Sequence, residues 1–134
     1  MFYNFAVTVL AGTTKDDPKE QELNLTHGFV HRIEVDFPFG CRGYVYLVIF
    51  HRLQQKWPTN IDEAFHAEGY TVPIDEHFDL TEPPHTLLVR AWSPECIHDH
   101  RIAVRVGILP EAALAPLTGL GAMLAKFFRV LGVR

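Results

Sequence analysis

The amino-acid sequence predicts a mainly β protein, an antiparallel β-sandwich with jelly-roll-like connections that is followed by a C-terminal α-helix. Three observations predict this fold class. Between residues 2 and 109, apolar side chains recur with a period of two, as in strands that bury one face. Glycine- and proline-containing breaks divide this region into seven or eight short runs. After Pro110 the apolar spacing changes to three and four residues, which is typical of a helix.

A chain of 134 residues has the length of one domain with a terminal appendage. We therefore divide it into a β-sandwich domain of residues 1–109 and a C-terminal helical arm of residues 110–134. Residues 1–12 are apolar but no basic residue precedes them, so we interpret them as a strand and not as a signal peptide. Cys41 and Cys96 are too few for a disulfide framework, and the sequence leaves open whether they are bridged.

The expected strands are recognised by the apolar residues that alternate along them. In chain order, the residues of these alternating runs are Tyr3, Phe5, Val7 and Val9; Leu23 and Leu25; Phe29, His31, Ile33, Val35 and Phe37; Tyr70, Val72, Ile74, Phe78 and Leu80; Leu87, Val89 and Ala91; and Ile102, Val104, Val106 and Ile108. Residues 44–50 are apolar at every position, which predicts a strand covered on both faces. Pro73 indicates an edge strand or a break.

Two connections have a distinct pattern. Residues 38–43 form a short glycine-containing segment between two strong strands, which predicts a hairpin. Residues 53–68 form a long insert in which Asn60 and Glu63 have the spacing of a helix cap, so we expect a loop with one short helical turn.

The arm carries one apolar stripe and a basic end. The stripe, which we expect to contact other copies or a membrane, comprises Leu117, Leu120, Leu124, Phe127, Phe128 and Leu131. The basic contacts are Lys126, Arg129 and Arg134. Fifteen helical residues rise only about 22 Å, short of the roughly 30 Å of a bilayer core, so the stripe predicts a surface contact and not a membrane span.

Three fates are open to this stripe. Packing on its own sandwich is the least favoured, because we expect charged outward residues such as Arg32, Glu34 and Arg105 to leave no groove on either sheet. Packing against other copies of the chain buries the stripe symmetrically. Lying in a lipid interface uses the phenylalanines as wedges and the basic residues as headgroup contacts.

Cys96, His98 and His100 form the most suggestive polar cluster, because residues two apart in a strand share a face and these side chains are metal ligands. His98 and His100 resemble the His-x-His element of the cupin family, a resemblance that implies a small metal-dependent enzyme. The strand that follows contains no Glu to complete that family's site. We therefore interpret the segment as a polar turn with Asp99 at its tip, and we expect no metal, no cofactor and no catalytic residue.

Other residues leave alternatives open. His31 lies on the apolar side of its predicted strand, which indicates a hydrogen-bonded core histidine. The eight histidines permit a pH-sensitive interface. Several aromatic residues fall outside clean core positions and fit either an interface or the core beneath the long insert: Phe39, Trp57, Phe65, Tyr70 and Trp92. Twelve basic against sixteen acidic residues argue against a nucleic-acid partner.

A small alternating sandwich with exposed aromatic residues and a terminal arm resembles the single jelly-roll structural proteins of viruses. The resemblance implies a capsid or decoration component of a virion that works as a homo-oligomer, with other shell proteins as further partners. We hypothesise a non-enzymatic, self-assembling structural protein whose C-terminal helix mediates oligomerisation. The alternatives are a membrane-peripheral protein that docks through the amphipathic helix, and a cupin-like metal-dependent enzyme. Outside a virion, we expect the protein in the cytoplasm.

Overall fold

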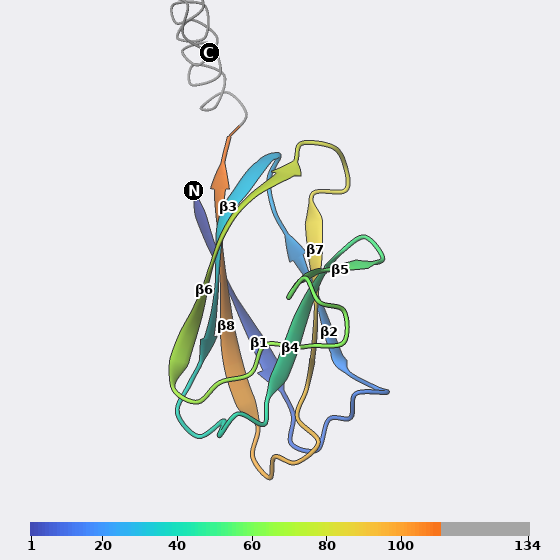
Figure 1. The fold of residues 1–134 in the computed structure, drawn as a ribbon, viewed down its shortest axis with the longest axis vertical. Coiled ribbons are helices and arrows are strands. Elements are labelled where there is room, and N and C mark those ends of the chain that lie inside the picture. Colours follow the sequence, from blue (N-terminus) through green and yellow to red (C-terminus); the bar gives the residue numbers. More distant parts are fainter. Residues whose placement is uncertain (111–134) are drawn as a thin grey trace, which may run out of the picture.

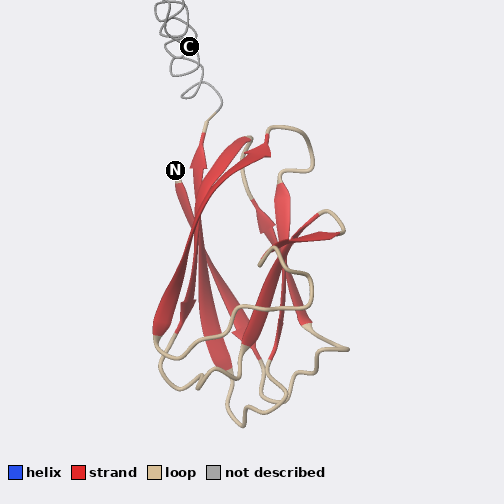
Figure 2. Cartoon of the chain, in the orientation of Figure 1, coloured by secondary structure: helices blue, strands red, loops and turns tan. Residues whose placement is uncertain are grey.

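The structure, a computed structural model, describes residues 1–110. The predicted arm and its stripe therefore lie outside the described residues. Residues 1–110 contain strands and no helix, and no membrane-spanning helix occurs among them (Figure 2). The strands are β1 (Phe2–Val9), β2 (Lys19–Asn24), β3 (Gly28–Phe37), β4 (Tyr46–His51), β5 (Gln54–Trp57), β6 (Tyr70–Leu80), β7 (Thr86–Trp92) and β8 (His100–Leu109).

Two four-stranded sheets face each other in the described region (Figure 1). The strand order is β1-β8-β3-β6 in the first sheet, sheet A, and β2-β7-β4-β5 in the second, sheet B. All neighbouring strands run antiparallel. Successive strands alternate between the sheets except at β4 and β5, so the strand order is that of an eight-stranded jelly roll. The sandwich prediction is confirmed.

The core forms where the inner faces of the sheets meet. It is built from alternate residues of the strands, as the period-two pattern predicts, and its fully buried members include Val7, Leu23, Val35, Leu47, Val89 and Val104. β4 is covered on both faces, as predicted: Leu47 and Ile49 face the core, whereas Val48 faces outward and is still only 3 % exposed. Other parts of the chain therefore cover Val48 on the outer face of sheet B.

Two connections differ from the sequence prediction. Residues 38–43 do not form a hairpin, because they join β3 in sheet A to β4 in sheet B. The insert of residues 53–68 contains a strand, β5, whose only fully covered residue is Trp57. The expected helical turn is a single turn closed by the Glu63 amide, which donates to the Asn60 carbonyl over 3.1 Å.

The expected position of His31 is wrong, because β3 contains a bulge. The register of β3 shifts between Val30 and Arg32 against both neighbouring strands. An extra residue in a strand moves the preceding side chains to the opposite face. Val30 is therefore buried, and His31 lies outside, where its ring meets the edge of the Phe2 ring at 5.6 Å.

The ends of the sandwich differ in what they carry. The chain ends of the described region lie together, because the Met1 and Ile108 backbones exchange hydrogen bonds of 3.1 and 2.7 Å. The β1–β2, β3–β4 and β7–β8 loops lie at the opposite end, which we call the loop end (Figure 1). Pro110, the last described residue, therefore lies far from the loop end.

Replacing Phe37 tests the core. Phe37 is fully buried at the end of β3, whereas Phe39, two residues later, is 86 % exposed. We expect Phe37→Ala to lower the free energy of unfolding by about 3–5 kcal/mol, because it leaves a cavity. Phe39→Ala is the matched control and should change it by less than about 0.5 kcal/mol. Urea unfolding followed by fluorescence measures both, and equal losses in the two variants would contradict the assigned core.

Candidate functional site

Five large apolar side chains on the loops and strand ends of the loop end are exposed to solvent. We call this group the loop-end patch, and its members and exposed fractions are Leu10 (59 %), Phe39 (86 %), Tyr44 (43 %), Tyr70 (57 %) and Ile97 (85 %). They come from four segments that are far apart in the sequence. Exposed clusters of this kind mark interaction surfaces, where aromatic residues are enriched.

Hydrogen bonds between the loops hold the loop-end patch in shape. The Glu68 carboxylate accepts hydrogen bonds of 2.9 Å from the amides of Gly40 and Arg42, on either side of Cys41. Gly69 has a φ of 54°, and a Cβ at this position would collide with the Phe39 ring, so glycine is needed there. The loop that carries Phe39 is thereby fixed against the start of β6.

A second set of bonds fixes the other half of the loop end. The Asp99 carboxylate accepts a hydrogen bond of 2.7 Å from the Ala11 amide. The Ser93 hydroxyl, which is fully buried, donates to the Leu10 carbonyl over 3.1 Å. Leu10 and Ile97 therefore sit on loops that are tied to one another, and association at this end needs little reordering of the backbone.

The predicted metal candidates lie in the same region. Cys96, His98 and His100 line one cavity of about 370 Å³ together with Cys41 and Tyr44. They do not share a strand face as expected, because only His100 belongs to a strand and residues 93–99 form a loop. Within residues 1–110, no group of three potential ligands could hold a metal ion.

Both cysteines are free thiols. Burial, with a contribution from the nearby Cys96, raises the pKa of Cys41 to about 11. Burial and then the Glu95 carboxylate raise the pKa of Cys96 as well. Only the thiolate is a good nucleophile, so neither side chain is suited to nucleophilic chemistry at neutral pH.

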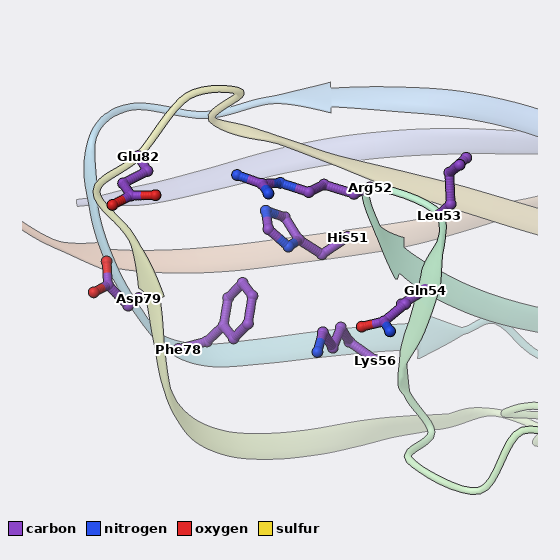
Figure 3. A pocket seen from close by; sticks show the side chains of 8 residues that line it. All are labelled: His51, Arg52, Leu53, Gln54, Lys56, Phe78, Asp79 and Glu82. Carbon is purple, nitrogen blue, oxygen red and sulfur yellow. The ribbon is translucent and has the colours of Figure 1, made fainter.

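The opposite end carries a larger hollow of about 700 Å³ between the β4–β5 hairpin and the end of β6 (Figure 3). His51, Arg52 and Lys56 line it on the hairpin side, opposite Asp79 and Glu82. The His51 ring packs edge-on against Phe78 at 4.9 Å, and its Nε2 atom is buried without a hydrogen-bond partner. The sequence showed only that His51 lies in a strand, because the residues of this hollow come from two distant segments.

Electrostatics keep His51 neutral. Burial lowers its pKa, and the neighbouring charges of Arg52 and Lys56 lower it further. Two hydrogen bonds from Thr81, through its side chain and its amide, lower the pKa of Asp79. The hollow therefore presents a neutral imidazole and charged groups of both signs at neutral pH.

The outer faces of the two sheets have different chemistry. On sheet A, Glu34 accepts hydrogen bonds from Arg105 at 3.0 Å and Arg32 at 2.9 Å, and these bonds lower the pKa of Glu34. Arg32 also bonds Asp75 at 2.8 Å. The sequence predicted that neither outer face has a groove, and this prediction was based on Arg32, Glu34 and Arg105. All three residues belong to sheet A. The prediction is wrong for sheet B, whose outer face carries a groove of about 360 Å³.

The five aromatic residues left open by the sequence divide between the two interpretations. Trp57 is buried, and Phe65 packs against the core beneath the insert. Phe39 and Tyr70 are exposed in the loop-end patch. Trp92 is half-buried and stacks on Tyr46 at 6.0 Å on the outer face of sheet B. Exposed and core positions therefore occur in the same set, and the interface interpretation of the exposed ones stays a prediction.

Comparison with known proteins gives remote likenesses only. No family model and no curated protein matches the chain. Among solved structures, the chain is similar to hydroxypropylphosphonic acid epoxidase from S. wedmorenis in complex with fosfomycin, at 14 % identity and a TM-score of 0.40, covering 80 % of this chain and 43 % of the epoxidase. It is also similar to a chain in the structure of tomato aspermy virus, at 12 % identity and a TM-score of 0.44, covering 84 % of this chain and 80 % of the virus chain. A third similar structure is that of Bacillus endospore appendages, at 10 % identity and a TM-score of 0.32, covering 81 % of this chain and 88 % of the appendage chain.

Thiol reactivity tests the burial of the loop-end cysteines. A pKa of about 11 leaves about 0.1 % of Cys41 as thiolate at pH 8, in a side chain that is also buried. We therefore expect iodoacetamide to modify the partly exposed Cys96 first in the folded protein. Peptide mass spectrometry over time measures the order, with the urea-unfolded protein as the control in which both react. Equal rates in the folded protein would contradict the assigned burial of Cys41.

The pH dependence of stability tests His51. Because its pKa is lowered on folding, the unfolded chain binds more protons below the ordinary histidine pKa, and stability falls as pH falls through this range. We expect the free energy of unfolding to decrease from pH 7.5 to pH 5.5, and His51→Gln to flatten this slope. The exposed His98 supplies the control variant His98→Gln. If both substitutions leave the slope unchanged, His51 is not the group responsible.

Proposed function

We propose that the protein is a non-enzymatic structural protein that assembles with copies of itself into a protein shell, such as that of a virion. The observation that carries this proposal is the loop-end patch. Apolar surface exposed to water is costly, and loop-to-loop hydrogen bonds hold the backbone of the segments that carry Leu10, Phe39 and Ile97. A patch that is both apolar and preorganised fits a protein surface as its partner.

The two edges of sheet A, β1 and β6, favour association through loops over the addition of a strand to this sheet. Pro73 lies within β6, an edge strand of sheet A, and cannot donate a backbone hydrogen bond. At the other edge, the Gln21 side chain donates to the Ala6 carbonyl of β1 over 3.2 Å. Both edges of sheet A are thus partly blocked for a further strand, whereas the loop end is open.

The predicted arm supplies a second contact in this proposal. The arm follows β8 in the sequence, and β8 ends at the end of the sandwich opposite the loop end (Figure 1). A building block with contacts at two separate places can join more than two copies. This is the property that a shell needs.

Substitutions in the loop-end patch test the proposal. We expect the double variant Phe39→Asp/Ile97→Asp to raise the dissociation constant of the oligomer about tenfold or more, because a desolvated contact is worth at least about 1.4 kcal/mol. Stability should change little, since both side chains are exposed. Light scattering over a dilution series measures the mass of the particles.

Leu53→Asp is the matched control. Leu53 is 93 % exposed, as apolar as the patch residues, and lies at the opposite end on the β4–β5 turn. Its substitution should leave the dissociation constant unchanged. A wild-type protein that stays monomeric at every concentration, or equal effects of the two variants, would overturn the proposal. Binding of the wild-type monomer to anionic vesicles would favour the lipid-docking alternative instead.

A further inference from the structure

The groove on the outer face of sheet B lies between two loops. Its floor is formed by Val48, Phe50, Arg90 and Trp92, from the central strands β4 and β7. The β1–β2 loop forms one wall around residues 15–18, and the β5–β6 connection forms the other around residues 61–64. Val48 faces away from the core but lies at the bottom of this groove, between the two loops, and is only 3 % exposed.

The floor is aromatic and cationic. The Arg90 guanidinium lies over the Phe50 ring at 4.6 Å, and the Lys15 ammonium lies over Trp92 at 5.5 Å. The Arg90 Nε atom is buried and makes no hydrogen bond, with the nearest Glu20 carboxylate oxygen 3.7 Å away. Both cations of the floor therefore lie on aromatic rings of the same chain.

The charges that line the groove are mainly acidic. Four carboxylates against two cations give a net charge of −2: Asp16, Glu20, Asp62 and Glu63 face Lys15 and Arg90. On one wall, Ile61 is 76 % exposed. The chemistry of the groove therefore matches an occupant that is apolar on one side and basic at its margins.

The C-terminal segment of this chain has that composition. Residues 112–134 contain three basic residues, no acidic residue and the apolar stripe predicted above. Lys126 and Arg129 flank Phe127 and Phe128, so apolar and basic groups occur together. We infer that the groove on the outer face of sheet B binds residues 117–134 of a second copy of the chain. This inference rests on the proposed function and names the surface that receives the arm.

A second copy is favoured over the same chain by reach. From β8, the path to the groove passes β1, crosses to β2 and then reaches β7. With strands about 4.8 Å apart and sheets about 10 Å apart, this path around the edge is about 20 Å. The six residues 111–116 span at most about 21 Å when fully extended. Almost no extended length then remains to cover the further distance along the strands to the groove. A segment from a neighbouring copy does not have to follow this path.

Charge reversal on the two sides tests the inference in the full-length protein. We expect Asp62→Lys/Glu63→Lys in the groove to raise the dissociation constant of the oligomer about tenfold, and Lys126→Glu/Arg129→Glu in the arm to do the same. Carrying all four substitutions in one chain should restore the constant to within about threefold of wild type, since each reversed arm then meets a reversed groove. Glu22→Lys, an exposed residue of β2 that does not line the groove, is the matched control and should have no effect. Thermal unfolding confirms that each variant is folded.

A direct contact is measured by placing a photoreactive benzophenone side chain at position 128 in an equal mixture of isotope-labelled and unlabelled copies. Crosslinks between labelled and unlabelled peptides that map to residues 48–64 or 88–92 support the inference, and crosslinks within one copy overturn it. If the fourfold variant stays as weak as the others, or Glu22→Lys weakens association equally, the groove does not bind the arm although the protein still assembles. If the arm variant loses only vesicle binding, the arm contacts lipid. A wild-type monomer would instead contradict the proposed function itself.

Discussion

The structure depends on one constraint: two amphipathic sheets must bury their inner faces against each other. Each strand therefore places alternate side chains in a shared core, and the chain repeatedly crosses from one sheet to the other. Crossing moves the connections to the two ends of the sandwich, where backbone groups lack partners within the sheets. Side chains such as Glu68 and Asp99 satisfy some of these groups, and in doing so they shape the loop end.

Local patterns determined which parts of this fold could be predicted. Alternation within a strand is local, so the buried faces of β1, β7 and β8 and the double coverage of β4 followed from the sequence. The bulge beside His31 could not be predicted from the alternation. An inserted residue changes which side chains face the core, but it leaves no mark in the sequence pattern itself. β5 was missed because its residues are polar except for Trp57. The crossing at residues 38–43 depends on which strands pair, which no local pattern states.

The candidate site was predictable only in its parts. Phe39 and Tyr70 were recognised as aromatic residues outside clean core positions, yet nothing in the sequence placed them at the same end of the sandwich as Leu10 and Ile97. Cys96, His98 and His100 line one cavity, but the sequence did not indicate that Cys96 and His98 lie on a loop and not on a strand. The hollow at His51 joins two segments through tertiary packing alone. Proximity between distant segments, unlike burial, has no signal in a single sequence.

The unequal outer faces of the two sheets connect these observations. On sheet A, arginines and carboxylates pair with one another, so that face has little unmet binding capacity. On sheet B, aromatic rings and excess carboxylates remain in one groove. A basic apolar segment complements both, since its cations offset the carboxylates and its apolar side covers the rings. Because an isolated helix of about fifteen residues is marginal in water, an arm of this kind gains its order from the surface that receives it.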